Sequence, residues 1–152
     1  MAAGDILKEQ LLLVETFTVK SNEDIEKGEF CIDDGAGIVA ATAALAASGK
    51  AVMALEAHDY SEESDHDIEC VVVGYVEAQK VSGSGAARKG DKLMISGTAG
   101  EVTKFVKADA PSSYVEATIQ ANYDLNLGVV GIAIATTADA GTTQKMLLGV
   151  IG

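Results

Sequence analysis

Basic side chains, histidines and aromatic residues are scarce in this chain, and each shortage excludes a class of function. Eleven Lys and Arg stand against 23 Asp and Glu, which gives a formal net charge of −12. Proteins bind nucleic acids and anionic membranes through Lys and Arg, so this balance argues against both partners. With two histidines and no Gly-x-Ser-x-Gly turn, the chain has little from which to build a nucleophilic triad. We therefore expect no enzyme activity, no catalytic residues and no cofactor.

Long apolar runs and a leader peptide are also missing. No run approaches the ~20 residues of a membrane-spanning helix. Residues 1–10 lack the basic start and apolar stretch of a signal peptide. We therefore expect synthesis in the cytoplasm and no membrane partner. Cys31 and Cys70 are expected to be buried thiols, and a disulfide between neighbouring strands is the alternative.

The composition indicates one small domain with a thin core. A chain of 152 residues with 48% hydrophobic residues is long and apolar enough to bury a core. The aromatic residues are only three Phe and four Tyr, and Ala and Val dominate the apolar set. Small side chains make thin β-layers, which often complete their burial against a partner. The composition therefore favours an oligomer.

Alternation of apolar and polar residues predicts a β-rich domain. The clearest period-two pattern begins at Val14 and ends before the turn residues Ser21 to Asp24. Residues 1–13 are interpreted as an extended N-terminal arm, and residues 14–152 as one domain of about eight strands, which is mainly β and resembles a small barrel or sandwich. Further strands are expected at 50–60, 68–81, 92–96, 101–107, 128–137 and 145–151. Residues 40–47 predict a short helical turn or loop, and residues 114–121 predict a strand or a short helix.

One pattern occurs twice. Lys27-Gly28-Glu29 and Lys89-Gly90-Asp91 are each followed by an apolar run, a Gly-rich turn and a second apolar run. The two units, residues 27–39 and 89–102, predict a turn, a strand, a tight turn and a returning strand. This order is typical of small β-domains that bind or cover surfaces.

The acidic segment after residue 57 holds the best candidate for a metal site. Carboxylates and imidazoles together suit divalent ions. The spacing matches neither a helical His pair nor a calcium loop, so we interpret residues 61–67 as an acidic turn facing water. The candidate ligands are His58, Asp59, Asp65, His66, Asp67 and Glu69.

Two further motifs are incomplete. Gly83-Ser84-Gly85-Ala86-Ala87-Arg88 begins like a dinucleotide fingerprint, but Arg88 stands in place of the third glycine, so we expect a hairpin loop. The Lys-Gly-acid turns and Leu55-Glu56-Ala57 resemble biotin or lipoate carrier domains, but His58 and Asp59 occupy the place of the modified lysine.

The order of segments along most of residues 12–151 resembles the capsid decoration (cement) proteins of tailed viruses, including a related group defined only as a domain of unknown function. Residues 61–67 and 108–124 are insertions relative to this pattern. The segments that carry the resemblance are Lys27 to Glu29, Ala51 to Leu55, Val72 to Ala78, Gly83 to Asp91, Gly128 to Ala133 and Met146 to Val150.

The resemblance implies a structural protein on the outer surface of an icosahedral virion. It implies a homotrimer at local three-fold positions that binds the major capsid protein and stabilises the shell. The capsid contact is expected in Met1 to Leu13. The alternative is a non-enzymatic β-barrel module that binds host-surface or glycan ligands. Such a module needs clustered aromatic side chains, and the tyrosines are scattered along the sequence at Tyr60, Tyr75, Tyr114 and Tyr123.

Overall fold

The structure is a computed structural model that describes residues 3–46, 49–107 and 115–149. Strand is the main regular structure, at 41% against 11% helix. The elements are β1 (Ile6–Thr18), β2 (Phe30–Asp33), β3 (Ile38–Ala40), α1 (Ala43–Ala46), β4 (Val52–Ala54), β5 (Asp67–Gln79), β6 (Lys92–Ile95), β7 (Val102–Lys104), α2 (Glu116–Leu127), β8 (Val129–Ala133) and β9 (Thr143–Leu148).

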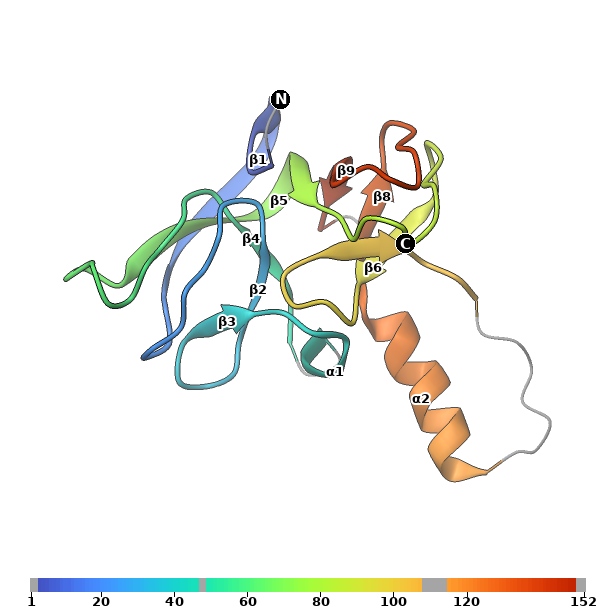
Figure 1. Ribbon diagram of the computed structural model, residues 1–152, viewed down its shortest axis with the longest axis horizontal. Helices are drawn as coiled ribbons and strands as arrows, with labels where there is room; N and C mark the ends of the chain where they lie inside the picture. Colours follow the sequence, from blue (N-terminus) through green and yellow to red (C-terminus); the bar gives the residue numbers. More distant parts are fainter. Residues whose placement is uncertain (1–2, 47–48, 108–114, 150–152) are drawn as a thin grey trace.

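The strands form a single antiparallel sheet that curls into a half-barrel (Figure 1). Along the sheet the order is β3-β2-β4-β5-β9-β8-β6-β7, and β1 pairs with the other edge of β5. The prediction of one mainly β, barrel-like domain is therefore confirmed. The expected boundary at residue 13 is not a boundary of the sheet, because β1 begins at Ile6 and pairs with β5 from there.

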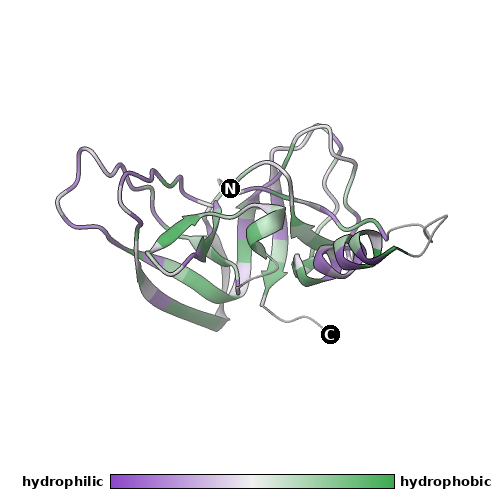
Figure 2. Cartoon of the chain, turned by 90° about the horizontal axis from the view of Figure 1, so that it is seen from below, coloured by the Kyte–Doolittle hydropathy of each residue, from purple (hydrophilic) through white to green (hydrophobic). Residues whose placement is uncertain are grey.

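The sheet buries two apolar clusters. The larger lies inside the curl of the sheet and includes Phe30, Met53, Leu93 and Met146, all fully buried. The smaller packs between β1, β2, β4 and β5, and it includes Ile25. Figure 2 shows the apolar residues gathered along the strands and the polar residues along the outer loops. Removal of these side chains from water is the main force that holds the curl.

The chain folds as two successive copies of one arrangement. The first runs β1-β2-β3-α1-β4, and the second runs β5-β6-β7-α2-β8. In each copy the second strand lies between its hairpin partner and the strand after the helix, because β2 pairs with β3 and β4 while β6 pairs with β7 and β8. β9 then pairs with β5 as β5 pairs with β1. The repeat seen in the sequence is therefore a repeat of the fold.

Hydrogen bonds outside the strands repeat as well. Ile25 and His58 exchange two backbone hydrogen bonds, of 2.9 and 2.8 Å. Ala87 and Thr137 exchange the corresponding pair, of 3.0 and 2.8 Å. His58 and Thr137 each stand four positions beyond the end of a strand, β4 and β8 respectively. His58 therefore occupies a backbone position that the second copy fills with Thr137.

The two Lys-Gly-acid turns share one geometry. Gly28 and Gly90 have φ values of 85° and 94°, a region that glycine enters without steric cost. Their N–H groups donate to the last residue of β4 and of β8, at 2.9 and 2.8 Å. The following acid, Glu29 or Asp91, accepts a hydrogen bond from the N–H three residues before it, at 2.9 and 2.7 Å. The acid side chain therefore closes the turn together with a backbone hydrogen bond between the same two residues.

The two acids differ in their surroundings. Burial raises the pKa of Glu29 above its usual range. The backbone N–H of Arg88 and the Lys104 ammonium, 3.0 Å away, hold the pKa of Asp91 below its usual range. The surroundings of Glu29 thus disfavour ionisation of its carboxyl group, whereas those of Asp91 favour it.

The copies differ most between their third and fourth strands. The link from β3 to β4 is residues 41–51, whereas the link from β7 to β8 is residues 105–128 and is more than twice as long. The longer link contains α2, which projects from the half-barrel (Figure 1). The segment predicted as a strand or short helix at residues 114–121 is helical from Glu116. Pro111 lies outside the described residues.

Candidate functional site

The acidic segment between β4 and β5 closes on a buried histidine. His58 is 2% exposed. Its Nδ1 lies 2.8 Å from Glu63 Oε2, and its Nε2 lies 3.1 Å from His66 Nδ1. The Tyr60 ring stacks on His66 with 3.9 Å between centroids. We assign the proton on His58 to Nδ1, because it faces a carboxylate, and His66 then donates to Nε2. Both ring nitrogens of His58 are occupied by the protein itself.

The other residues considered as metal ligands do not join this cluster. Asp59 accepts hydrogen bonds from the hydroxyl and the N–H of Ser61, which lower the pKa of Asp59. Asp65 accepts from the N–H of Asp67 at 3.1 Å. Glu69 is exposed on β5. Within the described ranges, no three His, Cys, Asp or Glu side chains are placed to hold a metal ion. The geometry is that of a loop closed by hydrogen bonds.

The glycine-rich segment after β5 is a loop, as predicted. Gly83 and Gly85 have φ values of 76° and 102°. Gly85 donates its N–H to the Asp139 carboxylate, and this bond ties the loop to the β8–β9 connection. The chain then enters β6 and not a helix. The segment therefore lacks the helix N-terminus that a dinucleotide pyrophosphate requires.

Both cysteines are buried free thiols. Cys31 lies on β2 and Cys70 on β5, and β4 lies between these strands. The disulfide alternative assumed that the two cysteines lie on neighbouring strands, and this is wrong. Burial raises the pKa of Cys70 to about 12 and that of Cys31 further still. Both thiols therefore stay protonated and poorly nucleophilic near neutral pH.

A hollow of about 380 Å³ lies beside the β8–β9 connection. Glu77 lines it and is 5% exposed; its Oε1 accepts from the Thr143 hydroxyl at 2.6 Å, and its Oε2 has no hydrogen-bond partner. Lys145 stands directly opposite Glu77 in the β5–β9 register and also lines the hollow. Cross-strand neighbours have Cβ atoms about 5 Å apart, within the reach of a lysine ammonium. No described ion pair joins the two side chains, so Glu77 Oε2 is buried without a partner beside the hollow.

The aromatic side chains do not gather. Tyr60 lies in the acidic segment, Tyr75 on β5 and Tyr123 on α2. Tyr114 is outside the described residues. In the described part of the chain, the aromatic platform expected of a glycan-binding module is therefore not found.

The outer edge of β1 is the longest open strand edge. No described backbone hydrogen bond joins residues 6–17 to an element other than β5. Its counterpart β5 has β1 on one edge and both β4 and β9 on the other. β5 is therefore paired on both edges, whereas β1 is paired only on the edge that faces β5. Unpaired edge groups of this kind accept a further strand.

An apolar row runs along α2. Val115, Ile119, Tyr123 and Leu127 follow one another at intervals of four residues, and they are 51, 51, 61 and 44% exposed. Helical spacing of four places Ile119, Tyr123 and Leu127 next to one another on α2, and Val115 precedes them as the N-cap residue, with an extended backbone. Apart from Leu13, every large apolar residue exposed in the described part lies between β7 and β8. We call Val115, Ile119, Tyr123 and Leu127 the α2 row; Val106 lies apart from it, just beyond β7.

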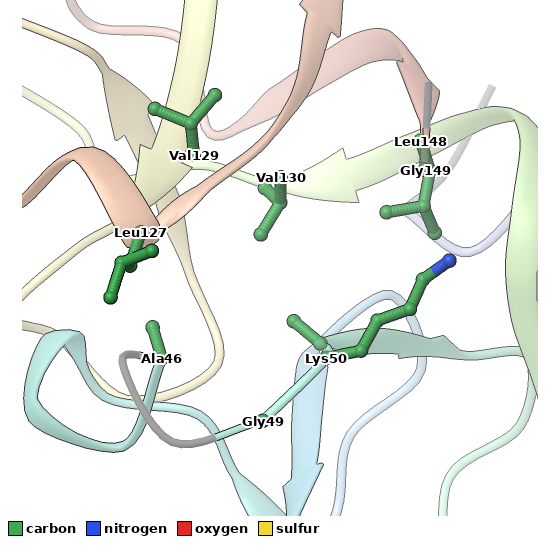
Figure 3. A pocket seen from close by; sticks show the side chains of 9 residues that line it. Ala46, Gly49, Lys50, Leu127, Val129, Val130, Leu148 and Gly149 are labelled. Atoms are coloured by element: carbon green, nitrogen blue, oxygen red, sulfur yellow. The ribbon is translucent and has the colours of Figure 1, made fainter. Parts of the chain in front are cut away.

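A hollow of about 280 Å³ opens at the C-terminal end of this row. We call it the α1–β8 hollow; Figure 3 shows the side chains of Ala46, Leu127, Val130 and Lys50 around its open centre. Its other walls come from residues 49–51 just before β4, from β8 and from the end of β9. Lys50 is the one charged residue in this lining. Leu127 belongs to both the row and the hollow, so the two apolar surfaces are continuous.

The composition of the α2 row and the β1 edge was not recognised in the sequence. The row could have been found from the i, i+4 spacing of its members, but Tyr123 and Leu127 lie beyond the predicted segment 114–121, for which a strand was considered equally. No helix in the described part is long and apolar enough to cross a membrane.

Comparisons with protein-family models, curated proteins and solved structures give no match to this chain.

Proposed function

We propose that this chain is a structural decoration protein that binds the outer surface of an icosahedral virus capsid and stabilises the shell. In this proposal it acts as a homotrimer at local three-fold positions, and the major capsid protein is its partner. The resemblance of the sequence to capsid decoration proteins suggests this function. The observation that carries it further is the open edge of β1.

The β1 edge offers a defined way to attach. A strand from the capsid protein would pair with residues 6–17, where the repeated arrangement leaves no partner. Backbone hydrogen bonds supply the affinity in this mode, and side chains on the strand faces supply the specificity. The expected contact, Met1 to Leu13, thus becomes an extension of the sheet and not the docking of a free arm.

Charge and copy number support the same function. A net charge of −12 suits an exterior position, because it opposes contact with packaged nucleic acid. Many copies that each bind weakly hold a shell firmly when they are linked to one another. The glycan-binding alternative gains no support from the placement of the tyrosines.

A substitution on β1 tests the attachment. Leu13 is 48% exposed, and an incoming strand would place its own side chains beside it. We expect Leu13→Lys to weaken binding to capsid shells that lack the protein by about tenfold or more. Co-sedimentation of the purified chain with shells from its own virus measures the affinity.

The matched control is Val106→Lys. Val106 is 68% exposed and lies beyond the end of β7, away from β1. The charge change is the same, so this variant should bind as the unchanged chain does. Equal binding by both variants would overturn the β1 contact, provided that circular dichroism shows both to be folded.

A further inference from the structure

α2 is an exposed helix with almost no charge. It carries Glu116 and Asp124 but neither Lys nor Arg. The two acids and Gln120 stand at intervals of four and form a polar row beside the α2 row, and Gln120 donates to Asp124 at 2.7 Å. An isolated helix of this length is marginal in water. An apolar row that the protein leaves uncovered indicates a partner that covers it.

The first copy forms the same strand order without a helix of this length. The first copy joins its third and fourth strands through residues 41–51, with only the short α1. The second copy builds the same strand order with α2 inserted. No member of the α2 row belongs to either buried cluster. The α2 row is thus not part of the buried core that the strands share.

The surface that complements the row is on the same molecule. The α1–β8 hollow has apolar walls and lies at the end of the row, where Leu127 joins the two surfaces. Lys50 is exposed at the hollow, and no described ion pair includes it. The polar row beside the α2 row offers acids to this ammonium. Polarity and charge therefore match between two different surfaces of one chain.

We propose that α2 of one copy of this chain docks into the α1–β8 hollow of a second copy, with Ile119 and Tyr123 in the hollow and Asp124 beside Lys50. Because the two surfaces differ, the contact is head-to-tail and closes into a ring when the rotation between copies permits it. The proposal deepens the proposed function by naming the interface of its trimer, and it rests on that function for the number of copies.

Light scattering across a dilution series tests the contact. The unchanged chain should have the mass of a closed assembly of several copies. Tyr123→Asp places a charge in the hollow and should raise the dissociation constant by about tenfold or more. Val106→Asp makes the same charge change at an exposed position outside the row, and it should leave the mass unchanged.

A charge exchange makes the test specific. Lys50→Asp and Asp124→Lys should each weaken the assembly, and the two together should restore it. A monomer at every concentration, an assembly that Tyr123→Asp leaves intact, or an exchange without recovery would each overturn the interface. An intact assembly that ignores capsid shells would instead overturn the proposed function and leave this interface standing.

Discussion

At the scale of single residues, the duplicated fold provides pairs of equivalent positions. The same substitution can be made at both positions of a pair, and the surroundings differ between them. Gly28 and Gly90 take the same place in the Lys-Gly-acid turns and have positive φ values. A Cβ at Gly28 would lie 2.7 Å from both the Ala3 Cβ and the Gly4 nitrogen, whereas a Cβ at Gly90 meets nothing within 4 Å. Both positions favour glycine because of their positive φ, and Gly28 also because residues 3–4 approach it closely.

We predict that Gly90→Ala lowers the free energy of unfolding by about 1–2 kcal/mol, the cost of a left-handed conformation. Gly28→Ala should lower it by a further ~1–3 kcal/mol, because the backbone of residues 3–4 must move. Urea unfolding of the two variants measures both values. Equal losses would show that residues 3 and 4 do not pack against the turn.

The acids of the same turns should respond to pH in opposite ways. The pKa of Asp91 is lowered by the Arg88 N–H and Lys104. Its contribution to stability is therefore complete above its ordinary pKa of about 4 and is lost as the pH falls through the lower, folded value. Asp91→Asn keeps an acceptor for Arg88 but should flatten this acid limb, measured as unfolding free energy against pH.

Glu29→Gln is the contrasting variant. Burial raises the pKa of Glu29, so its contribution is complete below its ordinary pKa and is lost as the pH rises through the higher, folded value. This substitution should remove a loss of stability on the alkaline side of that ordinary pKa. If both variants changed the acid limb alike, the assigned surroundings of the two carboxylates would be wrong.

At the scale of elements, the sequence predicted strands well where local rules and tertiary packing agree. The hairpin at residues 30–40 and the closing pair β8 and β9 were found because turn residues separate apolar runs. β1 was predicted too short, because its N-terminal part shows no alternation and pairs through its backbone with β5. The β1–β5 register shifts at three places, one of them between Lys8 and Leu12, which pair with Tyr75 and Gly74.

The candidate surfaces were harder to foresee than the strands. The alanine-rich segment forms the helix α1 from Ala43 to Ala46, as its propensity favours. The hollow beside it requires α1, β8 and β9 to meet, and these are far apart in the sequence. The His58 network likewise joins residues whose spacing matches no known motif. Sequence rules describe local periodicity and do not predict contacts between residues that are far apart in the sequence.

The long β7–β8 link should be dispensable for folding. We predict that replacing residues 105–128 with the sequence of residues 41–51 yields a chain that still unfolds in one cooperative transition, because the first copy closes the same strand order with that link. Circular dichroism should show the helical signal reduced and the β signal retained. A chain without a cooperative transition would mean that α2 is part of the core.

At the scale of the whole molecule, the chain is a duplicated β-frame with two exposed surfaces that we propose for assembly. The open edge of β1 is proposed to meet the capsid, and the α2 row is proposed to meet a second copy. The two surfaces lie on different elements, so substitutions at Leu13 and Tyr123 test them separately. The shared expectation is that the chain acts by binding, in many copies, to an ordered lattice.

The most direct test of this function is quantitative co-sedimentation of the chain with capsid shells, from its own virus, that lack it. We predict saturable binding at a fixed number of copies per shell, together with greater resistance of the decorated shells to heat. No binding above background, or binding without a saturating stoichiometry, would contradict it.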